Sequence, residues 1–136
     1  MQPMIMTMPL KRKMAAVLTV LVTTAVLVNI YSAYAQQETK ASIVSGAPTM
    51  GDKAFSPNPI QTKVGDTIIW TNNDSVPHTV TSGTGPNDPN MGKDFDVGIS
   101  TPISPGSTFS HKFTTAGEFP YFCQIHPTMV GNVIVS

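Results

Sequence analysis

The sequence predicts an all-β fold, an antiparallel β-sandwich or barrel, for the part of the chain that follows residue 35. Apolar and polar residues alternate there with a period of two in several short runs. The turn signals "SPNP", "VGD", "SPGS" and "TAGE" separate these runs. After residue 35 there is no apolar pattern of useful length with the 3.6-residue period of a helix. With 136 residues in all, the chain is long enough for one domain.

The N-terminal segment, residues 1–35, reads as an export signal. "KRK" at 11–13 precedes an uncharged run over 14–35, which ends in the small-x-small site "AYA". This pattern predicts a signal peptide that is cleaved before Gln36. The run is also long enough to span a bilayer as an uncleaved anchor. In both cases the remainder is expected outside the cytoplasm, in the periplasm or on the outer face of the cytoplasmic membrane.

The elements after the signal follow in order. Residues 36–53 are polar and punctuated by Gly and Pro, which predicts a linker with one possible short strand near Ile43. The domain itself is expected over 54–136. In "DTIIWTN", Ile68 and Trp70 share one face, as a half-buried strand requires. Strands are predicted over 66–72, 78–81, 107–113, 118–123 and 131–136.

One long polar segment, 82–98, interrupts the strand pattern. Its sequence, "SGTGPNDPNMGKDFDVG", is rich in turn residues and predicts a loop. Such a loop lies at the functional end of a small domain or is a tolerated surface insertion, and both interpretations stay open. Asp88, Asp94 and Asp96 are expected on its solvated face, where they could steer a basic partner.

Charge and cysteine content exclude several classes of function. The chain after residue 35 has five lysines, no arginine and eight acidic residues, a net charge of −3. It has no basic stripe, so nucleic acid is not an expected partner. Cys123 is the only cysteine, so no internal disulfide can form. Because an exported lone thiol oxidises unless something occupies it, a metal is expected at Cys123.

The stretch "CQIHPTM" supplies three candidate ligands, Cys123, His126 and Met129. Pro127 lacks the N–H that a strand needs, so these residues are expected in a tight loop that turns all three side chains toward one point. Ca²⁺ and Mg²⁺ prefer oxygen ligands, and structural zinc gains little from a thioether. Thiolate, imidazole and thioether together favour one copper ion that cycles between Cu(I) and Cu(II).

A fourth ligand comes from "NNDSVPHTV", which places His78 at the start of a predicted strand, 45 residues before Cys123. The expected site has His78, Cys123 and His126 in a rough plane with Met129 axial. The scaffold would hold this geometry rigid while the metal supplies the redox chemistry.

The stretches "VGDTIIWTNNDSVPHTV" and "FTTAGEFPYFCQIHPTMVGNVIV" resemble the small blue copper proteins, the cupredoxins. Within this family, the Cys-x-x-His-x-x-Met spacing is similar to the short ligand loop of amicyanin. The two stretches also resemble plastocyanin. The resemblance covers residues 54–136. It implies an eight-stranded Greek-key sandwich that binds one copper ion and carries single electrons between larger redox proteins. His78, Cys123, His126 and Met129 match the family's ligands, and the family's role is not enzymatic.

This chain departs from the family at Thr79, where many relatives have an asparagine that ties the two ligand loops together. The threonine hydroxyl has a shorter reach, while the backbone N–H of residue 79 can still donate to the sulfur of Cys123. Pro77 and Thr79 are thus expected beside the ligands. Electrons are expected to pass at the solvent edge of His126, through an apolar docking surface that includes Pro127 and Met91. Docking should be brief, and the protein a monomer.

Other roles are open to the histidines, to Trp70 and to the Cys–His pair. His111 shares a face with Phe109 and Phe113 and is expected to be a packing histidine, and Trp70 a core residue. A Cys–His pair also serves as nucleophile and base, but no oxyanion loop is evident. The chain has neither His-x-His pairs for a multicopper oxidase nor a second cysteine for a binuclear centre. A copper storage or delivery protein remains the alternative function, and a metal-free binding sandwich a third.

Overall fold

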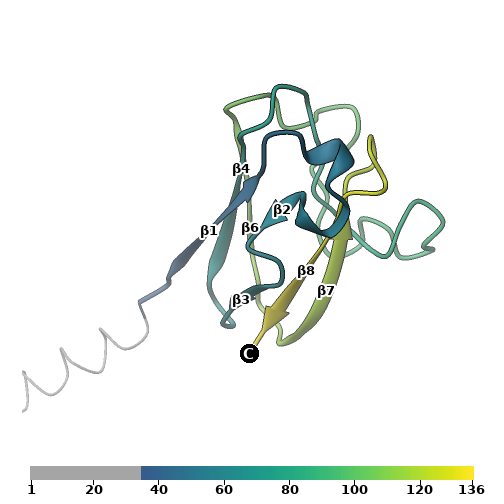
Figure 1. Ribbon diagram of the computed structural model, residues 1–136. Helices are drawn as coiled ribbons and strands as arrows, with labels where there is room; N and C mark the ends of the chain where they lie inside the picture. The colour runs from purple at the N-terminus through teal and green to yellow at the C-terminus, as the bar shows by residue number, and fades with distance from the viewer. Residues whose placement is uncertain (1–34) are drawn as a thin grey trace, which may run out of the picture. The chain divides into compact units, whose positions relative to one another are not determined.

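The computed structural model describes residues 35–136, and the predicted signal or anchor over 1–35 lies, except for its last residue, outside the described residues. Residues 36–136 form one compact unit of two four-stranded sheets (Figure 1). The all-β sandwich predicted from the sequence is confirmed. Within residues 35–136, no helix combines the length and apolarity needed to traverse a bilayer.

The first sheet has the strand order β2-β1-β4-β6. Its bounds are Glu38–Ile43 for β1, Phe55–Ser56 for β2, Thr67–Asn72 for β4 and Thr108–Lys112 for β6. β1 pairs with β2 on one side and with β4 on the other. The possible short strand predicted near Ile43 within the segment 36–53 is present as β1, and it is an inner strand of this sheet. Its sequence is mostly polar because only Ala41 and Ile43 of β1 are buried.

The second sheet has the strand order β3-β8-β7-β5. Its bounds are Ile60–Thr62 for β3, Thr81–Ser82 for β5, Gly117–Phe122 for β7 and Val130–Val135 for β8. Four of the strand pairs within 36–136 are antiparallel, as predicted, whereas β1 with β4 and β3 with β8 are parallel pairs. The chain crosses between the sheets before and after β3, and a crossover permits parallel pairing, which a hairpin does not.

The segment 78–81 also differs from its predicted strand. His78 forms only an isolated bridge with Ile103, and β5 is reduced to Thr81 and Ser82. Two short 3-10 helices, η1 (Ala47–Thr49) and η2 (Gly51–Lys53), precede β2 and were not predicted. The remaining strand predictions are confirmed to within one or two residues at each end.

The core lies between the sheets and is centred on Trp70, which has no exposed surface. Its Nε1–H donates to the hydroxyl of Tyr121 at 3.2 Å, and the ring of Phe95 stacks on it with centroids 5.9 Å apart. Phe95 belongs to the loop 82–98, so this loop contributes to the core and is more than a surface insertion. Tyr121 lies on β7 two residues before Cys123, so the same core fixes the approach of the strand to the predicted site.

His111 is half-buried on β6 and packs against Phe95 and Phe113, with ring centroids 5.1 Å and 4.8 Å away. Burial lowers the pKa of His111, and the nearby charge of Asp94 raises it by a smaller amount. These contacts confirm the expected packing histidine.

Candidate metal centre

Residues 123–129 form the connection between β7 and β8, which Figure 1 draws in yellow. The N–H of Cys123 donates to the carbonyl of Met129 at 3.1 Å, and the N–H of Met129 donates to the carbonyl of His126 at 2.9 Å. These two bonds close the loop on itself. Pro127, which has no N–H to satisfy, occupies its exposed side. The predicted tight ligand loop is therefore present.

Three of the predicted ligands meet at one point. The Sγ of Cys123 lies 3.8 Å from Nδ1 of His78 and 3.9 Å from Nδ1 of His126. The three ligand atoms all lie within 4.8 Å of one another. Cys123 and His78 have no exposed surface, whereas His126 is half-buried. Two distant segments of the chain thus converge here, as the sequence predicted.

These separations fit a single metal ion. First-row ions such as zinc bind thiolate at about 2.3 Å and imidazole at about 2.0 Å, which places sulfur and nitrogen about 3.7 Å apart in a trigonal plane. The two sulfur-to-nitrogen distances of 3.8 and 3.9 Å are close to that value. A thiolate and two imidazoles suit copper, whereas hard cations prefer oxygen. His78, Cys123 and His126 are therefore positioned to bind one metal ion.

Met129 ends the loop, and its side chain is fully buried in the same core cluster as Cys123. Burial of this kind suits both packing and a thioether ligand. Its axial role stays a prediction.

Thr79 links the two ligand-bearing segments. Its backbone N–H donates to the Sγ of Cys123 at 3.3 Å, the bond that the sequence allowed for. Its hydroxyl accepts a hydrogen bond from the N–H of Gln124 at 2.7 Å. The threonine that stands in place of the relatives' asparagine thus reaches across to the ligand loop. Pro77, the other residue expected beside the ligands, is exposed next to the buried His78.

A buried carboxylate fixes the ring of His78. The Oδ2 of Asp74 lies 2.7 Å from Nε2 of His78, and Oδ1 of Asp74 accepts the N–H of Gly46 at 3.0 Å. The bond from Gly46 first, and then that from His78, hold the pKa of Asp74 below its ordinary value. An ionised carboxylate accepts a hydrogen bond from Nε2–H, and in that tautomer the lone pair of Nδ1 is free to bind a metal beside the sulfur of Cys123.

Sequence reasoning did not single out Asp74 or Asn72. The Nδ2 of Asn72 donates to the carbonyls of Val76 and Ile103 at 2.8 and 2.9 Å, and its Oδ1 accepts the N–H of Asp74 at 2.9 Å. Asn72 thereby holds the bend that leads to His78. An aspartate four residues before a candidate ligand histidine was the available signal for Asp74. Asn72 gave none, because a polar residue at a strand end is common.

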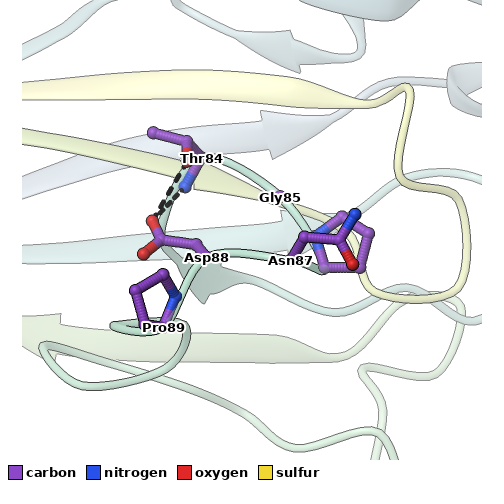
Figure 2. Close-up of a pocket in the computed structure, with 6 residues that line it drawn as sticks. Thr84, Gly85, Asn87, Asp88 and Pro89 are labelled. Carbon is purple, nitrogen blue, oxygen red and sulfur yellow. Dashed lines mark hydrogen bonds between the residues drawn. The ribbon is translucent and has the colours of Figure 1, made fainter.

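A surface pocket of about 370 Å³ lies over residues 84–89 of the loop 82–98 (Figure 2). Asp88 is the one charged residue that lines it. Its Oδ2 accepts the N–H and the hydroxyl of Thr84 at 2.8 and 3.1 Å, the bonds drawn in Figure 2. Its Oδ1 accepts the N–H of Asn90 at 2.8 Å. These bonds hold the pKa of Asp88 below its ordinary value, the bond from Thr84 most of all. The carboxylate is thus committed to its own loop, and the pocket has no charge free for a ligand.

Comparison with known proteins agrees with this geometry. The family described as copper binding proteins, plastocyanin/azurin family, matches residues 42–136. Plastocyanin, chloroplastic, from Tetradesmus obliquus is 35% identical over 97 residues, which is 70% of this chain and 66% of that protein. Amicyanin-alpha from Methylorubrum extorquens is 32% identical over 81 residues, 60% of this chain and 63% of that protein. The chain thus spans slightly less than two thirds of these relatives.

Solved structures show the same fold. A purple cupredoxin from Nitrosopumilus maritimus has a TM-score of 0.58 and 34% identity, over 72% of this chain and 99% of that one. A reduced variant of amicyanin has a TM-score of 0.55 and 25% identity, over 73% of this chain and 82% of that one. With its sandwich fold and its His-Cys-His cluster, this chain belongs to the plastocyanin/azurin family of copper binding proteins.

Proposed function

We propose that this protein is an extracytoplasmic mononuclear blue copper protein, which carries single electrons between larger redox proteins. The main support for this proposal is the position of the Cys123 sulfur, which lies 3.8 Å from Nδ1 of His78 and 3.9 Å from Nδ1 of His126. When bound there, copper supplies a one-electron couple between Cu(II) and Cu(I). A site in which Cys123 and His78 are fully buried suits an electron carrier, because an electron needs no open path for a substrate to reach the metal.

Each residue has a separate task in this proposal. Cys123 supplies the thiolate, while His78 and His126 supply the two imidazoles. The fully buried Met129 supplies a weak axial thioether. Asp74 orients His78, and the N–H of Thr79 partly neutralises the charge of the thiolate. Because the hydrogen bonds of Asp74 and Thr79 hold these groups in place, little rearrangement is needed when the charge of the site changes.

Electrons would enter and leave through His126, the one half-buried ligand. Ile125 and Pro127 beside it are exposed, and Met91 on the loop 82–98 is 39% exposed. We assign these apolar residues to a docking surface. Brief contacts between carriers use small interfaces, which release the partner quickly. Redox proteins are the proposed partners, nucleic acid is not, and the carrier acts as a monomer.

Export through residues 1–35 belongs to the same proposal, with the segment either cleaved or kept as an anchor through 14–35. The relatives named plastocyanin, chloroplastic, and amicyanin are consistent with an electron carrier outside the cytoplasm. An exported site also explains why the lone thiol is buried beside two histidines and is not left open to oxidants.

A copper titration of residues 36–136 tests the proposal. Cu(II) should produce an intense visible thiolate-to-copper band that a mild reductant bleaches reversibly. Cys123→Ser should abolish the band, whereas His111→Ala, at a histidine that packs against Phe95 and Phe113, should keep it. A colourless complex, or loss of the metal on reduction, would instead favour copper storage or delivery. No tight copper uptake at all would favour a metal-free binding sandwich.

A further inference from the structure

Beside the ligands lies a cluster of polar side chains that the family resemblance does not account for. It consists of Thr79, Thr81, Asp96 and Gln124, from three separate segments of the chain. Thr79 and Thr81 have no exposed surface, Gln124 is half-buried and Asp96 is exposed. Gln124 immediately follows Cys123, and Thr79 immediately follows His78, so two members of the cluster are neighbours of ligands in the sequence.

Hydrogen bonds connect all four members. The Nε2 of Gln124 donates to the hydroxyl of Thr81 at 2.9 Å and to Oδ1 of Asp96 at 3.1 Å. The hydroxyl of Thr81 lies 2.8 Å from Oδ1 of Asp96 and 3.1 Å from the hydroxyl of Thr79. The hydroxyl of Thr79 accepts the N–H of Gln124 at 2.7 Å. The cluster is therefore a closed ring of hydrogen bonds. One of its members, Thr79, also donates its backbone N–H to the Cys123 sulfur.

Asp96 brings the loop 82–98 into this ring. It forms an isolated bridge with Thr81, and the N–H of Val97 donates to the carbonyl of Val80 at 3.3 Å. At the other end of the loop, the N–H of Gly83 donates to the carbonyl of Pro120 at 2.8 Å. The bonds of Asp88 to Thr84, which Figure 2 shows, and to Asn90 stiffen the tip. The loop is thus a preformed unit whose returning end is held against the ligand loop.

From this arrangement we infer that Gln124 and Asp96 are positioning residues for the metal centre, an inference that rests on the proposed function. They hold the hydroxyls of Thr81 and Thr79 in place, and Thr79 in turn directs its N–H at the Cys123 sulfur. The tie between the two ligand segments is here divided among four side chains. It also makes the loop 82–98 part of the support of the metal site.

This role has a measurable consequence for the copper-loaded protein. An N–H that donates to a thiolate withdraws electron density from the sulfur and so disfavours the more highly charged ion. Hydrogen bonding around the cysteine sulfur is one of the features that set the potential of such sites. If the ring of bonds is opened, the Thr79 N–H loses its fixed direction, the potential falls and the visible band shifts.

The test compares four variants. Gln124→Met keeps the length of the side chain without its amide and changes no charge. Asp96→Ala removes the carboxylate, while Asp96→Asn keeps an oxygen acceptor at the same position and should rescue the loss. Asp94→Ala removes an equal charge from the exposed side chain two residues earlier and serves as the control. If Asp96→Ala does not fold, Gln124→Met alone decides the outcome.

The first measurement uses the metal-free proteins. Hydrogen exchange of the backbone amide of residue 124 and alkylation of Cys123 by iodoacetamide should each become about five- to tenfold faster in Gln124→Met and Asp96→Ala, the effect of losing about one net hydrogen bond. Asp96→Asn and Asp94→Ala should behave like the wild type. Unchanged rates in Gln124→Met overturn the inference.

The second measurement uses the copper-loaded proteins. The reduction potential should fall and the thiolate-to-copper band should shift in Gln124→Met and Asp96→Ala, relative to the wild type and to Asp94→Ala respectively. Faster exchange with an unchanged potential and band would mean that the cluster only stabilises the fold, which overturns the positioning role. A wild type that gives no coloured complex would refute the proposed function, and the alkylation rates would still decide whether the cluster positions Cys123.

Discussion

The carboxylate of Asp74 lies 2.7 Å from Nε2 of His78, while the other nitrogen of the same ring, Nδ1, lies 3.8 Å from the sulfur of Cys123. One imidazole therefore connects a buried acid to the metal-binding thiol. Because Asp74 also accepts the N–H of Gly46, the segment between β1 and β2 is tied to the site as well.

Asp74→Ala should weaken both the fold and the site. It leaves the buried Nε2 of His78 and the N–H of Gly46 without their acceptor, which costs about 1–3 kcal/mol of unfolding free energy. Loss of a carboxylate that orients a ligand histidine typically lowers metal affinity by about 10–100-fold. Urea unfolding of the metal-free protein and competition with a copper chelator measure the two effects. Asp52→Ala, at an exposed carboxylate in η2, should change neither, and equal values for both variants would contradict the role of Asp74.

Met129→Leu separates ligation from packing. Leucine conserves the volume of the fully buried side chain, so the metal-free protein should lose less than about 1.5 kcal/mol of stability. If the thioether is an axial ligand, the potential and the visible spectrum of the copper-loaded variant should change, since the axial ligand tunes both. Reductive titration with visible spectroscopy measures them. A spectrum and potential identical to the wild type would assign Met129 to packing alone.

Gly131→Ala should destabilise the second sheet near the site. A Cβ at this position would overlap Cζ of Tyr121, whose ring is fully buried and whose hydroxyl accepts a hydrogen bond from Trp70. Because neither ring can move without disturbing the core, overpacking should cost about 1–3 kcal/mol. Chemical denaturation measures the loss. Val130→Ala, at the partly exposed neighbour, should cost less than about 1 kcal/mol, and a Gly131→Ala variant as stable as this control would show that the tyrosine can yield.

His111 should make the metal-free protein less stable as the pH falls below neutrality. Burial lowers the pKa of His111 in the folded state from its ordinary value of 6.5. The unfolded chain therefore binds the proton first, so the contribution to stability is complete above pH 6.5 and is lost as the pH falls through the folded-state pKa. His111→Phe removes the titrating group while it keeps an aromatic ring beside Phe95 and Phe113. Urea unfolding at pH 7.5 and at pH 5 measures how much unfolding free energy is lost between these two pH values. This loss should be smaller for His111→Phe than for the wild type, and equal losses would contradict the prediction.

Much of the fold was predictable because the pattern that predicts a strand is local. Ile68 and Trp70 share one face of β4, and both are fully buried, whereas Ile69 between them is only partly buried. The prediction was incomplete where the neighbouring strands in the sheet, and not the local sequence pattern, decide the structure. β1 has a polar sequence, yet it becomes an inner strand because β2 and β4 supply partners for its backbone. The parallel pairing of β3 with β8 joins residues about 70 positions apart, and no local signal encodes it.

The sequence by itself determined the chemistry of the site. A thiol, two imidazoles and a thioether in the observed spacing identify a soft, redox-active metal, because ligand type is a property of each side chain and does not depend on the fold. The convergence of Cys123 and His126 was also readable, since a short loop with a proline leaves few other arrangements.

Only the tertiary structure decided which groups support those ligands. Asp74, Asn72, Thr81, Asp96 and Gln124 are ordinary polar residues in the sequence, and their roles come from the two or three hydrogen bonds that each makes across segments. Hydrogen bonds depend on distances of about 3 Å and on direction, and these are fixed only when both sheets and their loops are packed together.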